Sequence, residues 1–131
     1  MDYIPILEDQ VKTAMAEYLR RNGYQAVNAQ LGTRQGYDVE GVNPETGIRL
    51  VIECKGEAKR GSQHHRSWPN VASAILTSLN ERYTEGNKNE VAIGLPDTKE
   101  YRERMSRLKD FFQQEKIQVF WVSGNNEVVR W

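Results

Sequence analysis

The strongest constraint on the fold of this chain is an apolar segment that ends in charged residues. Residues 50–52 read Leu-Val-Ile, a run rich in β-branched side chains that is typical of a buried strand, and it continues directly into Glu53 and Lys55. Side chains of a strand alternate between its two faces, so Glu53 and Lys55 share one face while Cys54 lies on the other. The end of this strand must therefore accommodate a carboxylate and an ammonium group side by side.

A second strand is predicted just before the first. Residues 37–42 and 48–55 flank residues 43–47, whose proline and glycine favour a turn. The two strands should form an antiparallel hairpin that brings Asp38 back towards Glu53.

The register of this hairpin decides whether the two carboxylates meet. If Val42 pairs with Ile48, Asp38 lies opposite Ile52, and a bulge or a shift by one residue is needed to place Asp38 and Glu53 on one face. Carboxylates on opposite faces of the sheet would exclude a shared metal ion.

Two carboxylates and a lysine at one point of a sheet favour metal chemistry. A carboxylate pair binds hard cations such as Mg²⁺, and a neighbouring lysine can orient a water or offset charge on a phosphate. The pattern predicts metal-assisted hydrolysis of a phosphodiester. The alternative is structural: Asp38 is then an ordinary turn residue, and Glu53 and Lys55 form a solvated ion pair on a half-exposed strand.

Asp38, followed after an intermediate gap by Glu53-Cys54-Lys55, resembles the signature of the PD-(D/E)XK nuclease superfamily. Glu53-x-Lys55 matches the second half of this signature, whereas Tyr37 stands at the position of the proline that gives the family its name. The resemblance implies an α/β, restriction-endonuclease-like fold, with a central mixed β-sheet flanked by helices. It further implies a metal-dependent DNA endonuclease, most similar to small Holliday-junction-resolvase-like or restriction-like members, that uses Mg²⁺ or Mn²⁺.

The resemblance also implies a role for each motif residue. Asp38 and Glu53 would bind the metal ion together with the backbone carbonyl of Cys54, and Lys55 would align the attacking water. Some resolvase-like members add a metal-associated glutamate from the first helix, and Glu8 is the best candidate for it here, with Asp9 second. The basic segment after the motif is expected to contact nucleic acid through Lys59, Arg60, Gln63 and Arg66.

Length and composition limit the remaining possibilities. With 131 residues the chain is expected to form a single domain over residues 1–131, and it has neither a membrane-spanning run nor a secretory signal, which predicts a soluble, cytoplasmic protein without membrane partners. Cys54 is the only cysteine, which excludes an internal disulfide and a multi-cysteine zinc site.

Charge bears on the partners of the chain. Its formal net charge is zero, which counts against a non-specific DNA binder. One alternative is therefore a catalytically silent nuclease-like domain that binds nucleic acid or a protein, and another is a plain α/β interaction module. As a nuclease acting on DNA, so small a chain has little surface for base readout, which leaves three alternatives: a homodimer, a branched or damaged substrate, or a partner subunit.

Hydrophobic periodicity predicts the order α-β-β-α-β-α-β-β, with residues 24–28 as a candidate for an additional short edge strand. The nuclease family has a core of a helix, three strands, a helix and a further strand, so the resemblance extends over residues 7–96 in element order. The expected elements are a helix over 4–22, the hairpin strands 37–42 and 48–55, a loop over 56–66, a helix capped by Ser67 with Pro69 in its first turn, a strand over 91–95, a helix capped by Asp97 or Thr98 that extends through Phe112, and strands over 117–122 and 127–131.

Overall fold

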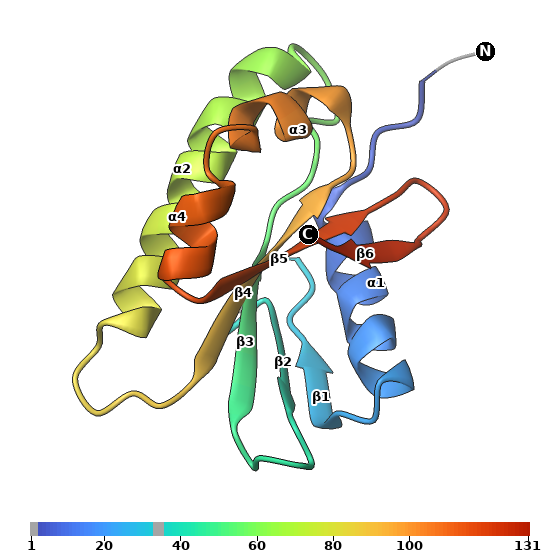
Figure 1. Cartoon of the computed structure of the whole chain (residues 1–131). Coiled ribbons are helices and arrows are strands. Elements are labelled where there is room, and N and C mark those ends of the chain that lie inside the picture. The colour runs from blue at the N-terminus through green and yellow to red at the C-terminus, as the bar shows by residue number, and fades with distance from the viewer. Residues whose placement is uncertain (1–2, 33–35) are drawn as a thin grey trace.

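A computed structural model describes residues 3–32 and 36–131, which form a mixed α/β fold (Figure 1). Its elements are α1 (Glu8–Arg21), β1 (Gln25–Ala29), β2 (Val39–Val42), β3 (Arg49–Cys54), α2 (Gln63–Arg82), β4 (Glu90–Pro96), α3 (Lys99–Met105), α4 (Lys109–Gln114), β5 (Ile117–Val122) and β6 (Val128–Arg130). The strands form a six-stranded sheet in the order β1-β2-β3-β4-β5-β6. The pairs β3–β4 and β4–β5 are parallel and the other three are antiparallel, so α2 and the α3–α4 segment are crossovers between parallel strands.

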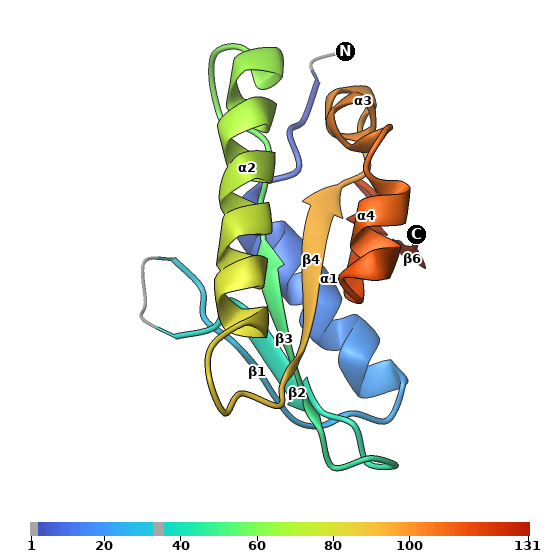
Figure 2. The ribbon, with the colours of Figure 1, turned by 60° about the vertical axis from the view of Figure 1, so that its left-hand side comes forward.

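Helices cover both faces of this sheet. In Figures 1 and 2, α2, α3 and α4 lie on one face, whereas α1 lies on the other. The side chains of β3 alternate accordingly, because Leu50 and Ile52 belong to the apolar core beside α1 and Val51 to the core beside α2. The same alternation directs Glu53, at the end of the strand, towards the face covered by α2.

The first helix starts later than the sequence predicts. Residues 4–7 are not helical, so the predicted helix with Pro5 in its first turn is wrong there. The reason is a tertiary contact: the Ile6 N–H donates to the Glu57 carboxylate at 2.9 Å, and the Ile6 carbonyl accepts from the Glu57 N–H at 2.7 Å. This pairing holds the segment extended beside the chain that follows β3.

The second helix starts earlier than the sequence predicts. Its N-cap is Ser62, whose hydroxyl accepts a hydrogen bond from the His65 N–H at 3.2 Å, so the predicted cap at Ser67 is wrong. Ser67 is instead a buried residue of the helix, and Pro69 lies inside the helix rather than in its first turn. The predicted loop over residues 56–66 therefore ends at Ser62.

The other elements match the prediction apart from their ends. The β5 bounds are those predicted, Thr98 caps α3, and the candidate edge strand is present as β1. The predicted third helix is divided into α3 and α4, because the chain turns after Met105, where the Ser106 hydroxyl donates to the Glu103 carbonyl at 2.9 Å. The observed order is thus α-β-β-β-α-β-α-α-β-β. No helix in the described part of the chain is both long and apolar enough to cross a membrane.

Candidate active site

The hairpin between β2 and β3 has the register that brings the two predicted carboxylates together. Val42 pairs with Arg49 rather than with Ile48, so the pairing is shifted by one residue from the simplest expectation. The shift originates in the turn, where Gly47 has a φ of +70° and donates its N–H to the Asn43 carbonyl at 2.8 Å. Glycine adopts this backbone conformation without strain.

The shifted register places Asp38 beside Glu53. Val39 pairs with Ile52, so the next residues outward along the two strands are Asp38 and Glu53. Both line one cavity of about 40 Å³ between the sheet and α2. Burial and, second, the negative charge of Asp38 raise the pKa of Glu53 above its ordinary value, although Lys55 opposes this. The two predicted metal ligands therefore share one environment.

Backbone contacts hold Asp38 in place. One of its carboxylate oxygens, Oδ2, accepts a hydrogen bond of 2.8 Å from the backbone N–H of Cys54. Each carboxylate oxygen has two lone pairs, so this bond leaves Asp38 able to bind a cation as well. The Cys54 side chain is fully buried on the opposite face, which agrees with a role for its backbone alone.

Lys55 lies next to Glu53 as the strand alternation predicts. Its ammonium group is 3.2 Å from Glu53 Oε1, and both side chains are largely but not fully buried. The Lys55 N–H donates to the Gly94 carbonyl of β4 at 3.0 Å, which fixes the backbone immediately beyond β3. The next residue, Gly56, packs so closely on the start of α1 that a Cβ there would lie 2.1 Å from the backbone nitrogen of Glu8. The motif strand and the first turn of α1 are thus directly in contact.

Lys12 is a residue of this site that the sequence reasoning missed. It lies on α1, it is 2% exposed, and its ammonium group is 3.7 Å from Asp38 Oδ1. Glu8, the predicted additional acid, is 3.2 Å from the same ammonium group, so Lys12 lies between Glu8 and Asp38. The available signal was its spacing, because Lys12 falls three residues before Met15 and seven before Leu19, on the apolar stripe of the helix.

Tyr37, the residue before Asp38, connects the site to α2. Its hydroxyl donates to Glu81 Oε1 at 2.7 Å, and the side chains of Asn87 and Asn89 donate to the same oxygen. Burial raises the pKa of Glu81, but these hydrogen bonds outweigh it and lower the pKa below the ordinary value. The segment before Asp38 is therefore anchored to the helix by a charged hydrogen-bond network.

Asp38 and Glu53 are the two carboxylates that a metal ion could use at this cavity. Ser78 of α2 lines the same cavity, and its buried hydroxyl has no hydrogen-bond partner among the described residues. The cavity is large enough for at least one water, which would satisfy this hydroxyl. Within the described residues, no group of three or more His, Cys, Asp or Glu side chains could hold a metal ion. An ion here would therefore depend on the two carboxylates, the Cys54 carbonyl and water, as Mg²⁺ sites commonly do.

Three of the four predicted nucleic-acid contacts line one open groove. This groove has a volume of about 780 Å³, and its lining includes Glu8 of α1 together with Lys59, Arg60 and Arg66, all three exposed. The fourth predicted contact, Gln63, already forms hydrogen bonds within the protein. Its side-chain amide accepts from the Ala58 N–H and donates to the Ala58 carbonyl, each at 2.8 Å. Gln63 thus closes the loop before α2.

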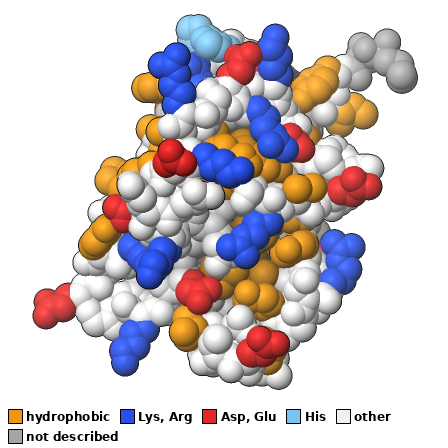
Figure 3. Space-filling model, viewed as in Figure 1, with side chains coloured by type: hydrophobic (Ala, Val, Ile, Leu, Met, Phe, Trp, Pro, Cys, Tyr) orange, Lys and Arg blue, Asp and Glu red, His pale blue; other side chains and the backbone are white. Residues whose placement is uncertain are grey.

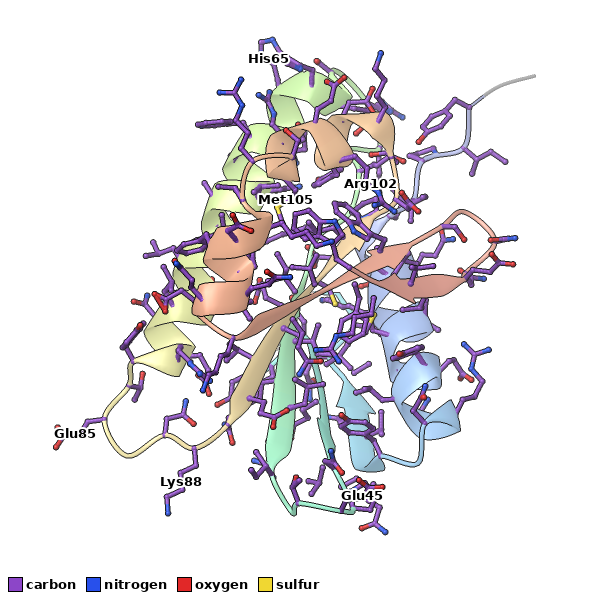
Figure 4. All side chains as sticks on the ribbon, in the orientation of Figure 1. Glu45, His65, Glu85, Lys88, Arg102 and Met105 are labelled. Atoms are coloured by element: carbon purple, nitrogen blue, oxygen red, sulfur yellow. The ribbon has the colours of Figure 1, made fainter. Side chains whose placement is uncertain are left out.

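The groove lies at one end of the molecule. Figure 4 shows His65, another residue lining the groove, at the end where α2 begins, far from Glu45 at the tip of the β2–β3 hairpin. On the face seen in Figure 3, lysine and arginine side chains alternate with acidic ones, in keeping with the net charge of zero. Positive charge is therefore a local feature of the groove rather than a property of the whole surface.

Comparison with known proteins identifies the fold but no family. No protein-family model and no curated protein matches the chain. Among solved structures it is similar to a FdxN element excision controlling factor protein from Anabaena variabilis, with a TM-score of 0.56 and 13% sequence identity over 95% of this chain and 96% of the other. At this identity the likeness shows a shared mixed α/β fold alone.

Proposed function

We propose that this protein is a metal-dependent deoxyribonuclease with a restriction-endonuclease-like fold, related to the PD-(D/E)XK nucleases. The observation that carries the proposal is the convergence of Asp38, Glu53 and Lys55 at the ends of two neighbouring strands, where both carboxylates line one cavity and Lys55 lies 3.2 Å from Glu53. The element order supports it, because α1, β1–β3, α2 and β4 follow the helix, three strands, helix and strand expected of this family.

The proposed chemistry assigns one task to each residue. Asp38 and Glu53 hold Mg²⁺ or Mn²⁺ with the Cys54 carbonyl, and the hydrogen bond from the Cys54 N–H keeps Asp38 oriented. A bound divalent ion lowers the pKa of water and offsets charge on the scissile phosphate. Lys55 orients the attacking water and stabilises the negative charge that develops on the phosphate oxygens.

The raised pKa of Glu53 is consistent with this role. Burial and the neighbouring charge of Asp38 disfavour a second negative charge at this point of the sheet. A divalent cation would remove that conflict, which is an energetic reason for the pair to bind one. The open groove with Lys59, Arg60 and Arg66 supports DNA as the substrate class, because its exposed cations can contact backbone phosphates.

A second candidate function is a catalytically silent domain that binds nucleic acid or a protein partner. The net charge of zero favours it, since nucleic-acid enzymes that bind without sequence preference usually rely on excess positive charge. The similar Anabaena variabilis structure is named a controlling factor, and a controlling role for the present chain would agree with this alternative. Retention of Asp38, Glu53 and Lys55 together argues against it.

The decisive experiment is a cleavage assay on a panel of duplex, single-stranded and four-way-junction DNA, with Mn²⁺, Mg²⁺ or EDTA. We expect cutting that requires the metal and that falls by about two orders of magnitude or more in Asp38→Asn, since metal assistance contributes several kcal/mol to such reactions. Glu45→Gln is the matched control, because this exposed carboxylate lies at the tip of the β2–β3 hairpin (Figure 4) and does not line the cavity of Asp38 and Glu53. Binding of a panel member without any cutting would instead favour the silent domain, and cutting that persists in EDTA would refute the metal mechanism.

A further inference from the structure

Helix α2 carries an apolar stripe that stays largely exposed in the described part of the chain. Trp68, Leu76 and Tyr83 lie on it and are 64%, 61% and 69% exposed. Figure 3 shows hydrophobic side chains along the side of the molecule on which α2 lies. The full stripe runs to the C-cap of the helix and consists of Trp68, Ala72, Ile75, Leu76, Leu79 and Tyr83. Intervals of three or four residues place side chains on one face of a helix, and an exposed apolar face is typical of an interaction surface.

The end of the stripe at the start of α2 is positively charged. The guanidinium group of Arg104, on α3, lies 5.1 Å from the centre of the Trp68 ring. It donates to the Ser67 hydroxyl at 3.1 Å and to the His64 carbonyl at 2.8 Å, so its position is fixed. A cation held against an exposed aromatic ring is thus the first feature that a partner must match.

The end of the stripe at Tyr83 is negatively charged. The Tyr83 hydroxyl donates to Glu115 Oε2 at 2.6 Å. This hydrogen bond and the charge of Glu115 raise the pKa of Tyr83 and outweigh the opposite effect of Arg82. The stripe therefore has an aromatic ring with a cation at one end and an aromatic ring with a carboxylate at the other.

We propose that a second copy of this chain covers the stripe, with the two α2 helices packed antiparallel about a two-fold axis. The positions of the stripe support this arrangement, because 68 and 83, 72 and 79, and 75 and 76 are each equidistant from one midpoint. An antiparallel pair centred there places every apolar position opposite an apolar position of the partner, as a two-fold interface requires. The same pairing places Arg104 of one copy beside the partner's Glu115, twice by symmetry. This inference is independent of the proposed function.

Charge and length describe the interface further. A nucleic acid would require positive charge along the whole stripe, whereas the Tyr83 end carries Glu115, so a second copy fits better. Trp68 and Tyr83 are 15 residues apart, which corresponds to a strip about 22 Å long and about 10 Å wide. Such a strip is smaller than the roughly 800 Å² per partner of a stable complex. We therefore expect a weak dimer, with a dissociation constant on the order of 10 μM.

Sedimentation equilibrium of the purified chain from about 1 to about 300 μM tests this inference. Leu76→Glu places a charge at the centre of the proposed interface, and we expect it to raise the dissociation constant about 30-fold or more. Val129→Glu is the matched control, because Val129 is 55% exposed but lies on the edge strand β6, whereas α2 packs on β3 and β4. Thermal unfolding of each variant shows whether it is folded.

A charge exchange tests the antiparallel arrangement. Arg104→Glu and Glu115→Arg should each weaken the dimer about 10-fold, because like charges then meet across the interface. The double variant should recover to within about 3-fold of the wild type. Arg104 and Glu115 lie at opposite ends of the stripe, so this recovery cannot arise within one copy.

Each possible result supports or overturns the inference. A wild-type chain that is monomeric at about 300 μM would overturn it, and loss of DNA binding in Leu76→Glu would then assign the stripe to nucleic acid. A dimer that Leu76→Glu leaves intact, or that Val129→Glu weakens equally, would place the interface elsewhere. A double variant as weak as the single ones would refute the antiparallel pairing. If Leu76→Glu does not fold, the charge exchange alone decides.

Discussion

The contact between Gly56 and the start of α1 allows a quantitative prediction about how the site is held together. A Cβ on Gly56 would lie 2.1 Å from the Glu8 nitrogen and 2.5 Å from the Leu7 carbonyl carbon, whereas real Cβ contacts below 3.0 Å essentially never occur. The two backbones would have to separate by about 0.9 Å. Gly56 cannot simply move away, because its carbonyl accepts hydrogen bonds from the Tyr101 hydroxyl at 2.8 Å and the Asn70 amide at 3.1 Å.

We therefore expect Gly56→Ala to lower the free energy of unfolding by about 3 kcal/mol, the upper end of the usual cost of overpacking. For a chain of 131 residues this corresponds to a decrease in Tm of roughly 10 °C. Urea unfolding followed by tryptophan fluorescence, to which the buried Trp121 contributes, would measure the change, with Gly124→Ala as the control, because a Cβ there meets nothing within 4 Å. A Gly56→Ala chain within about 1 kcal/mol of the wild type would refute the reasoning.

Three further predictions concern polar groups near the site. Tyr101→Phe should cost about 1–2 kcal/mol in urea unfolding, because the Gly56 carbonyl loses a buried donor; an unchanged midpoint would mean that this hydrogen bond contributes nothing. Ser78→Ala should leave the stability of the metal-free protein within about 1 kcal/mol, because its hydroxyl has no partner among the described residues and a cavity water can satisfy it; a loss of more than about 2 kcal/mol, read from Tm in EDTA, would contradict this. Glu81 has a lowered folded-state pKa, so its ionised form stabilises the fold above its ordinary pKa of 4.5, and this contribution disappears as the pH falls through the lower folded-state pKa. Glu81→Gln should therefore destabilise the protein at pH 7 and have a smaller effect at pH 3, as measured by urea unfolding at both values, and a pH-independent difference would show that the Tyr37 network does not depend on the charge.

The secondary structure could be predicted where local sequence patterns are strong. The prediction was wrong where contacts between distant residues determine where an element begins. The β5 bounds and the Thr98 cap of α3 follow from an apolar run and from capping chemistry, which need no information from elsewhere in the chain. The start of α1 could not be predicted, because Pro5 favours a first helical turn and only the pairing of Ile6 with Glu57 prevents it.

The candidate site could likewise be predicted in its local features but not in its hairpin register. Alternation along β3 places Glu53 and Lys55 on one face, and the structure agrees. The register that brings Asp38 beside Glu53 depends on the turn at Gly47, for which the sequence allowed two pairings. The assignments of catalysis, metal binding and DNA contact to these residues stay predictions that the cleavage experiment addresses.

The sequence by itself determined the apolar strands, the face on which Glu53 and Lys55 lie, and the presence of Asp38 beside a neighbouring strand. It did so because strand alternation and turn chemistry act between residues that are close along the chain. Only the tertiary structure decided the pairing of Asp38 with Glu53 and the position of Lys12, whose ammonium group is 3.7 Å from a residue 26 positions away. Such contacts depend on how α1 packs on the sheet, and packing between distant segments leaves no periodic pattern in the sequence.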